Sequence, residues 1–334
     1  MDLQWYDAQD FCVEGVGWPS EGHAFDRLPP RAEGLLNEAA WKQARHAVGI
    51  RVGFRAATSA LHVRATLRES PLPEHAYAKW LDLYARDEDR WRWAASSTHG
   101  YEPSGNTPMF TSWPAARRSY RLMMPVTFAV DRLELGFPAD AEPEALPPDP
   151  RRPVLIYGTS VVKASHASRP GMTWPACVER ELDWPVLNLG FSGAARSEPT
   201  LAPLLAEVDP AVFVVDPVPN MNAALIEQNL EAFLRAWMAV RPDTPILMIG
   251  PRRHADHWIR GDDYATHRSA QIAAFEAVYD ACRSDHPGGL HYLPGRVFED
   301  LPDDFTVDAS HPNDWGSALI AQRVAPAIAP LLPR

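Results

Sequence analysis

The sequence predicts an α/β protein in which a doubly wound parallel sheet follows a β-sandwich domain. Three observations lead to this prediction: a period of two in the first half, a proline-rich segment in the middle, and apolar strands that alternate with helix-period segments in the second half. Each pattern favours one architecture, because side chains return to the same face every two residues along a strand and about every 3.6 residues along a helix.

The first half has the alternating pattern of half-buried antiparallel strands. Apolar residues alternate with polar or small ones between positions 50 and 55 and between positions 61 and 67. Shorter runs follow at Trp80–Tyr84, Arg90–Ala94 and Arg121–Val130, and then around Leu133 and Leu135. An antiparallel sheet that buries one face produces this alternation. We therefore expect a jelly-roll-like β-sandwich.

A proline-rich segment between residues 138 and 153 separates the two halves. It contains Pro138, Pro143, Pro147, Pro148, Pro150 and Pro153. Each proline fixes φ and lacks an amide donor, so neither a helix nor a central strand can run through this segment. We interpret it as a stiff connector and predict an N-terminal domain over residues 1–148 and a second domain over residues 149–334.

The second half alternates predicted strands and helices. Five apolar runs are predicted to be buried parallel strands: Val154–Tyr157, Val186–Leu189, Ala211–Val215, Pro245–Ile249 and Leu290–Leu293. The intervening helices are predicted around Pro175–Leu182, Ala223–Val240, Tyr264–Cys282 and Trp315–Leu332. Such an order implies a doubly wound sheet whose ligand binds beyond the carboxyl ends of the strands.

Composition indicates a folded, anionic protein. The chain of 334 residues is 46% hydrophobic and 22% charged, with a net charge of −11, so we expect no nucleic-acid or membrane partner. The three cysteines are far apart, which favours reduced residues over a disulfide frame or a zinc site. The acidic start lacks the features of a signal peptide, and no apolar run approaches the roughly 20 residues of a membrane span. We expect a cytoplasmic protein with a small-molecule partner, and leave open whether it forms a homo-oligomer.

The most informative motif is Asp308-x-x-His311 near the C-terminus. A carboxylate three residues before a histidine can accept a hydrogen bond from the imidazole Nδ1, which leaves Nε2 free to take a proton from a serine. Ser160 is the candidate serine, because it follows the first predicted strand of the second half on a sharp turn. We therefore predict a catalytic triad of Ser160 as nucleophile, His311 as general base and then acid, and Asp308 as the orienting carboxylate.

Gly193 and Asn220 follow the next two predicted strands and fall at the same edge of the sheet. The Gly193 N–H can approach a developing oxyanion with no Cβ in the way, Asn220 can offer its side-chain amide, and the Ser160 N–H would be a third donor. Losing one such donor typically costs about 3–4 kcal/mol of transition-state stabilisation. Taken singly, these residues could equally cap helices or serve turns. Four such coincidences at one edge are less plausible than an active site.

These motifs resemble those of the SGNH (GDSL-type) hydrolases, which are mostly esterases and deacetylases. The resemblance rests on Ser160 in Gly158-Thr-Ser160, on Gly193 and Asn220, and on Asp308 with His311. It implies a flavodoxin-like SGNH hydrolase fold and assigns Ser160, Gly193 and Asn220 to an oxyanion hole. Thr159 stands where the family usually has an aspartate; that position does not supply the acid of the triad.

The chain also looks like a bacterial branch of this family in which a β-sandwich with a Gly-x-Asp-Leu-Tyr motif precedes the hydrolase domain. Residues 167–172, 188–193 and 310–313 suit that branch, as does Trp80-Leu-Asp-Leu-Tyr84 in the first half. Trp80 stands where the branch usually has glycine. The sandwich could bind carbohydrate, shape the active site or form a subunit interface.

Several other residues are weaker candidates. Met172, Trp174 and Met221 could line the acyl pocket, although packing explains the first two almost as well. The spacing of His254 and His257 could suit a metal, but no third ligand is well placed, so we predict no metal. His166 could lie near the nucleophile or in a surface loop. Arg252 and Arg253 could face an anionic substrate, but a solvated loop is the simpler interpretation.

The sequence thus predicts a serine esterase that cleaves a short acyl group, often acetyl, from a carbohydrate-like or other small polar alcohol without a metal or organic cofactor. A thioesterase or a lysophospholipase could use the same triad. A third alternative is a non-catalytic carbohydrate-binding protein with an inert hydrolase-like domain, which the intact Ser160, Asp308 and His311 disfavour.

Overall fold

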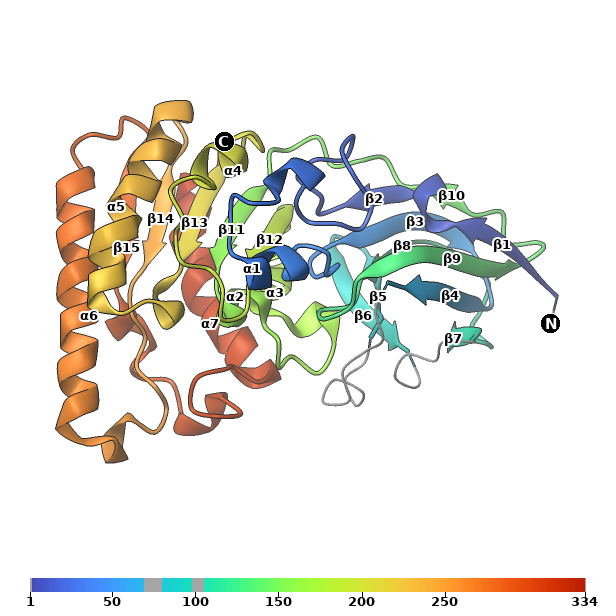
Figure 1. Cartoon of the computed structure of the whole chain (residues 1–334). Helices are drawn as coiled ribbons and strands as arrows, with labels where there is room; N and C mark the ends of the chain where they lie inside the picture. The colour runs from blue at the N-terminus through green and yellow to red at the C-terminus, as the bar shows by residue number, and fades with distance from the viewer. Residues whose placement is uncertain (1, 69–79, 98–104, 334) are drawn as a thin grey trace. The chain divides into compact units, whose positions relative to one another are not determined.

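A computed structural model describes residues 2–68, 80–97 and 105–333 and divides the chain into two compact units (Figure 1). The first unit comprises Met1–Pro29, Ala44–Pro150 and Ser168–Met172, and the second comprises Pro30–Gln43, Arg151–Ala167 and Thr173–Arg334. Each half of the sequence therefore contributes one short segment to the unit built mainly from the other half. Among the described residues, no helix is long and apolar enough to cross a bilayer.

The first unit contains two antiparallel sheets, which confirms the predicted β-sandwich. One sheet has the order β1 (Leu3–Asp7), β9 (Val130–Pro138), β4 (Leu61–Leu67) and β7 (Thr107–Phe110). The other has the order β10 (Glu144–Ala145), β3 (Arg51–Ala57), β8 (Arg117–Met123), β5 (Asp82–Asp87) and β6 (Arg90–Ser96), with β2 (Cys12–Glu14) also paired to β3.

The core of this unit lies between the two sheets. Along β3, Val52, Phe54 and Ala56 are buried, as the period of two predicts, but Arg51 and Gly53 are buried as well, so this strand is not half-buried as expected. The Phe54 ring stacks on Tyr120 of the same sheet at 5.2 Å and meets Phe137 of the other sheet edge-on at 5.4 Å. Aromatic packing of this kind adds to the burial of apolar area.

The run Arg121–Val130 is not a single strand, so this part of the prediction was wrong. β8 ends at Met123 and β9 begins at Val130. Pro125 lies between them and cannot donate to a sheet ladder, which explains the break. The only strand in the proline-rich connector is β10, which lies at an edge of its sheet, where prolines nearby are tolerated.

Trp80 occupies the position before β5 where related proteins usually have glycine. Its side chain is buried in the hydrophobic core of the first unit together with Leu81 and Leu83. The tryptophan is therefore a core residue, and the substitution adds apolar volume to the sandwich.

The aspartate and tyrosine of the same motif bind the segment Ser168–Met172. Asp82, which is fully buried, accepts hydrogen bonds from the Arg169 guanidinium, the Gly171 N–H and the Trp93 indole. The Tyr84 hydroxyl accepts a hydrogen bond from Arg169 at 2.9 Å. Burial raises the pKa of Asp82, and the positive charge of Arg169 opposes this shift. The motif thus explains why this short segment belongs to the first unit.

The second unit is built on a five-stranded parallel sheet. Its order is β12 (Val186–Gly190), β11 (Val154–Gly158), β13 (Val212–Asp216), β14 (Ile246–Ile249) and β15 (Leu290–Leu293). The first strand along the chain is therefore second in the sheet, which is the flavodoxin-like order 2-1-3-4-5. The doubly wound sheet predicted from the sequence is confirmed.

Helices cover both faces of this sheet (Figure 1). The helices of this unit are α1 (Glu38–Gln43), α2 (Ser160–Lys163), α3 (Trp174–Leu182), α4 (Ala202–Ala206), α5 (Ala223–Val240), α6 (Gly261–Cys282) and α7 (Asp314–Ile328). Ile156 of β11 packs in one core cluster with Trp174 of α3 and Val324 of α7. On the other face, Phe213 of β13 stacks on Trp237 of α5 with ring centroids 3.8 Å apart.

Candidate active site

The nucleophile candidate lies on the turn between β11 and α2. A Cβ at Gly158 would lie 2.3 Å from the Asp216 carbonyl oxygen, so the close approach of the two strand ends requires glycine. Thr159 then caps α2, because its hydroxyl accepts a hydrogen bond from the Val161 N–H at 3.3 Å. Threonine therefore serves as an N-cap at the position where the family resemblance led us to expect aspartate. Ser160 follows as the first residue of the helix.

The structure brings the three predicted triad residues into one hydrogen-bonded chain. The Ser160 hydroxyl lies 2.7 Å from His311 Nε2, and His311 Nδ1 lies 2.7 Å from Asp308 Oδ2. The other carboxylate oxygen, Oδ1, accepts hydrogen bonds from the Ser310 and His311 N–H groups at 3.1 and 2.8 Å. These bonds form a tight turn in which Ala309 has a φ of 72°.

The hydrogen bonds to Asp308 keep its carboxylate ionised. Partial burial acts to raise the pKa of Asp308, but the backbone and ring N–H groups of His311 and the Ser310 N–H outweigh that effect and hold the pKa at about 2. The carboxylate therefore remains charged at any neutral pH. The negative charge of this carboxylate beside Nδ1 stabilises the imidazolium that forms when Nε2 takes a proton.

Gly193 and Asn220 follow β12 and β13, as predicted. Gly193 has a φ of +66°, and nothing lies within 4 Å of the place where its Cβ would be, so the backbone conformation alone requires glycine. Asn220 ends a short 3₁₀ turn, and its side-chain amide donates toward the Phe191 carbonyl oxygen at 3.5 Å. Its side chain therefore lies beside the loop that contains Gly193.

Other residues take the helix-capping roles that were alternatives for the site residues. Asn222 caps α5 by accepting a hydrogen bond from the Leu225 N–H, so Asn220 does not cap that helix. Asn313 caps α7 in the same way, so the Asp308–His311 pair is not the cap of the last helix. Asn220, Asp308 and His311 are thus free of these capping roles.

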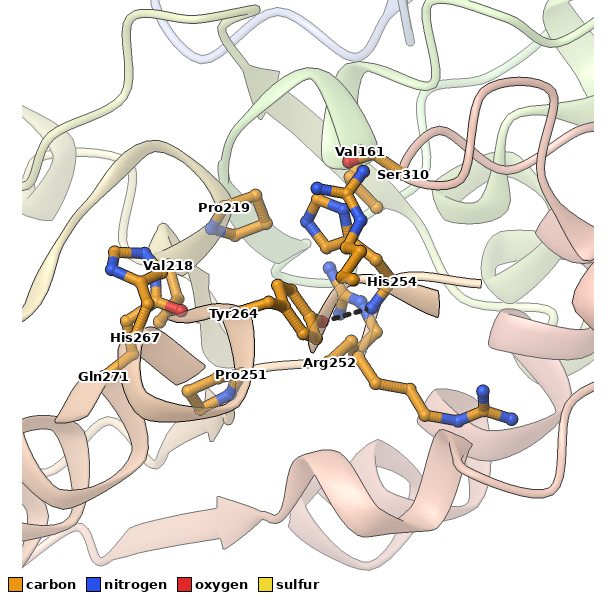
Figure 2. Close-up of a pocket in the computed structure, with 12 residues that line it drawn as sticks. Val161, Val218, Pro219, Pro251, Arg252, His254, Tyr264, His267, Gln271 and Ser310 are labelled. Atoms are coloured by element: carbon orange, nitrogen blue, oxygen red, sulfur yellow. Dashed lines mark hydrogen bonds between the residues drawn. The ribbon is translucent and has the colours of Figure 1, made fainter. Parts of the chain in front are cut away.

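A cavity of about 330 Å³ opens next to the triad (Figure 2). Val161 and Ser310, the chain neighbours of Ser160 and His311, lie together in its wall. The rest of the wall is mostly polar and includes Arg252, Arg253, His254, Arg260, Tyr264, His267 and Gln271. Figure 2 shows Tyr264 among these side chains, with its hydroxyl accepting a hydrogen bond from the His254 N–H at 2.7 Å.

The arginines of this wall are held by carboxylates. Arg252 donates two hydrogen bonds to Asp216, at 2.7 and 3.0 Å, and both side chains are buried. Burial raises the pKa of Asp216, and Arg252 opposes that shift. Arg260 pairs with Asp256 in the same loop region. The interpretation of Arg252 and Arg253 as a solvated loop is therefore wrong for Arg252, which is a buried part of the pocket.

The residues expected to line an acyl pocket are Met172, Trp174 and Met221. Trp174, the first residue of α3, is completely buried in the hydrophobic core. Met221 is 2% exposed, and its sulfur lies 3.8 Å from the Ser197 hydroxyl. Met172 belongs to the first unit. None of the three is in the wall of the cavity beside the triad. The burial of Trp174 and Met221 leaves them no surface to offer a substrate, so packing is their role.

His166 lies beside His311, in keeping with one of the two positions that the sequence left open for it. Its ring lies 4.5 Å from the His311 ring, centroid to centroid, with an angle of 31° between the planes. His166, Asp308 and His311 also place ligand atoms within 4.8 Å of one another, close enough to share a metal ion. Two of these residues are already hydrogen-bonded to each other in the triad. Within the described part of the chain, His254 and His257 belong to no such group.

Comparison with known proteins agrees with this geometry. The sequence model of the GDSL-like lipase/acylhydrolase family matches residues 151–329, which is more than half of the chain. A second model, for the N-terminus of SGNH-hydrolase-type esterases, matches residues 3–142. No protein with a curated description matches the chain significantly.

Several solved structures share the fold over nearly the whole chain. A protein from Bacteroides ovatus described as a GDSL-like lipase superposes with a TM-score of 0.90 at 23% identity, covering 99% of this chain and 98% of that one. A salicylyl-acyltransferase from a tetracycline biosynthetic pathway gives 0.80 at 17% identity, with coverages of 98% and 97%. A family two carbohydrate esterase from Cellvibrio japonicus gives 0.60 at 13% identity, with coverages of 99% and 98%. Because the family's sequence model matches more than half of the chain, the chain belongs to the GDSL-like lipase/acylhydrolase family.

Proposed function

We propose that this protein is a serine esterase that removes a short acyl group, with acetyl as the first candidate, from a carbohydrate-like or other small polar alcohol. The hydrogen-bonded chain from Ser160 through His311 to Asp308 carries the proposal. A serine, an imidazole and a carboxylate in this order form the constellation that activates a hydroxyl for attack on a carbonyl carbon. A non-catalytic carbohydrate-binding protein would have no need of it.

The reaction proceeds in two halves. Ser160 Oγ attacks the ester carbonyl while His311 Nε2 takes the hydroxyl proton; the tetrahedral intermediate then collapses, and His311 returns that proton to the leaving alkoxide. Water repeats the sequence on the acyl-enzyme, giving its proton to His311 and releasing the carboxylic acid and free Ser160. Asp308 stays ionised throughout, in keeping with its low pKa.

Three donors are proposed for the oxyanion: the N–H groups of Ser160 and Gly193 and the side-chain amide of Asn220. Ser160 is the first residue of α2, and N–H groups in the first turn of a helix have no acceptor within that helix. The Asn220 amide makes only a long bond, 3.5 Å, to Phe191, so little is lost when it turns to a better acceptor. Such donors act mainly on the transition state.

The cavity beside the triad supports a polar substrate. Its wall carries arginine and histidine side chains, and covering these with a fatty acyl chain would remove them from water without new partners. This argues against a lysophospholipase. The carbohydrate esterase and the salicylyl-acyltransferase that share the fold are both described by reactions that transfer an acyl group. This suits the proposal but does not define the alcohol.

Hydrolysis of p-nitrophenyl acetate, butyrate and octanoate by wild type and by Ser160→Ala tests the proposal. We expect wild-type kcat/KM to fall with chain length and the variant to lose turnover on all three esters. Acetylated sugars would then be compared with acetyl thioesters to separate an esterase from a thioesterase. A wild-type protein that prefers octanoate, or a Ser160→Ala variant as active as wild type, would contradict the proposal.

A further inference from the structure

We propose that Gln43 is a positioning residue for the oxyanion hole, because its side-chain amide fixes the direction in which the Gly193 N–H points. Gln43 lies 149 residues before Ser192 in the sequence, in a half of the chain that otherwise forms the β-sandwich. The inference rests on the proposed function, in which the Gly193 N–H is an oxyanion donor.

The amide of Gln43 makes two hydrogen bonds to the residue before Gly193. Gln43 Nε2 donates to the Ser192 carbonyl oxygen at 2.7 Å, and Gln43 Oε1 accepts from the Ser192 N–H at 2.7 Å. Gln43 is the last residue of α1, in the segment Pro30–Gln43 that belongs to the second unit. These contacts therefore lie within one unit.

The Ser192 carbonyl and the Gly193 N–H belong to the same peptide group. That group is planar and trans, so its C=O and N–H bonds point in opposite directions. A side chain that holds the carbonyl oxygen on one side therefore holds the N–H on the other side. The hydrogen bond to the oxygen also polarises the peptide and makes the N–H a better donor.

Because residue 193 is glycine, the Ser192–Gly193 peptide could rotate unless another contact restrains it. The residue has a positive φ of 66°, is exposed, and has no atom within 4 Å of where its Cβ would be, so no neighbour crowds that side of its backbone. Glycine reaches both signs of φ at little cost, which allows the preceding peptide to turn over. The two bonds from Gln43 supply the restraint that packing lacks.

A buried lysine determines which way round the Gln43 amide lies. Lys163 Nζ, at the end of α2, donates to Gln43 Oε1 at 3.2 Å, and Lys163 is only 3% exposed. Turning the amide over would place its NH₂ group against both the ammonium and the Ser192 N–H. The oxygen must therefore face these two donors, which leaves the Nε2 donor for the Ser192 carbonyl.

The other end of α1 holds the chain on the far side of Gly193. Asn37 Nδ2 donates to the Ala194 carbonyl at 2.8 Å and to Glu198 at 2.9 Å. Asn37 Oδ1 accepts from the Ala40 N–H, so the same side chain also caps α1. The short helix thus secures the residues on both sides of Gly193, with Gln43 acting on the peptide that carries the oxyanion donor.

Gln43→Glu is the sharpest test. The carboxylate is the same size and can still accept from the Ser192 N–H and from Lys163, but it cannot donate to the Ser192 carbonyl. We expect kcat on p-nitrophenyl acetate to fall by about 10- to 100-fold, the scale typical of a misplaced catalytic group, with KM within about twofold and the thermal midpoint nearly unchanged. Gln228→Glu makes the same chemical change at an exposed position of α5 and should match wild type.

The outcomes separate this inference from the proposed function. Wild-type kcat in Gln43→Glu, or a fall in kcat that comes with a raised KM and a lowered thermal midpoint, would overturn the positioning role. If Gln43→Glu does not fold, Gln43→Met, which keeps the length but has no donor, carries the same expectation for kcat and KM. A Ser160→Ala variant as active as wild type would remove the proposed function, and this inference with it; Ser160-dependent turnover that ignores Gln43 would remove this inference alone.

Discussion

Replacing Asp308 by asparagine exchanges one carboxylate oxygen for an NH₂ group, and it tests how the proposed triad acid works. The two carboxylate oxygens have separate partners: Oδ1 accepts from the backbone N–H groups of Ser310 and His311, and Oδ2 accepts from His311 Nδ1. In the variant, the remaining oxygen must stay with the two backbone donors, because an NH₂ group there would face two N–H groups. The asparagine NH₂ then faces Nδ1 and makes it an acceptor.

This arrangement forces the His311 ring into the wrong tautomer. With its proton on Nε2, the ring cannot accept the proton of the Ser160 hydroxyl, which lies 2.7 Å away. The same change in a serine protease triad lowers kcat by about 10⁴-fold. We therefore expect a loss of about 10³- to 10⁴-fold here, equivalent to about 4–5.5 kcal/mol in the activation free energy.

The fold should survive this substitution. Both backbone hydrogen bonds to the side-chain oxygen remain, and the Asp308 side chain is 45% exposed, so the free energy of unfolding should change by less than about 1 kcal/mol. The assay is kcat on p-nitrophenyl acetate, with thermal unfolding as the check on folding. Asp300→Asn, at an exposed surface pair with Arg323, is the matched control and should keep wild-type turnover. Activity of Asp308→Asn within tenfold of wild type would refute the tautomer argument.

Three further predictions follow from the contacts described above. Ser160→Ala, His311→Ala and the double variant should lose similar amounts of kcat, because the triad acts as a unit; additive losses would contradict the mechanism. Asp82→Ala should lower the free energy of unfolding by about 3–5 kcal/mol in chemical denaturation, since it leaves the charge of Arg169 without its buried partner; a change below about 1 kcal/mol would contradict the role given to the motif. Because the pKa of Asp308 falls from 3.8 to about 2 on folding, its contribution to stability is present above pH 4 and is lost as pH falls from about 4 to 2. The thermal midpoint of Asp308→Asn should accordingly depend less on pH than that of wild type in this window, and equal slopes would contradict the assignment.

The sequence was most informative about the second unit. Its strands are fully buried runs whose ends carry the site residues, so the predicted strand Val154–Tyr157 differs from β11 by one residue, and the predicted helix Ala223–Val240 matches α5. The hydrogen-bonded chain of Ser160, His311 and Asp308 was predictable because Asp308 and His311 share one turn and Ser160 follows closely after a strand, both of which are local features. The short strands β1, β2, β7 and β10 were missed because two to five residues are too few to establish a period.

Contacts between distant segments were not predictable. Nothing in the residues around Gln43 indicates that its amide binds Ser192, since α1 has only six residues and no motif marks it. The segment Ser168–Met172 joins the first unit because the buried Asp82 needs Arg169, which only the folded chain reveals. Trp174 follows the nucleophile closely in sequence and was a candidate for the acyl pocket, yet α3 turns it into the core.

Covalent labelling by a fluorophosphonate tests the central claim most directly. The reagent reacts with serines that a neighbouring base activates, and mass spectrometry of the labelled peptide identifies the site. The account predicts one label, on Ser160, that is absent from Ser160→Ala and strongly slowed in His311→Ala. A wild-type protein that is not labelled, or that is labelled at another serine, would contradict the claim that Ser160 and His311 form a working catalytic pair.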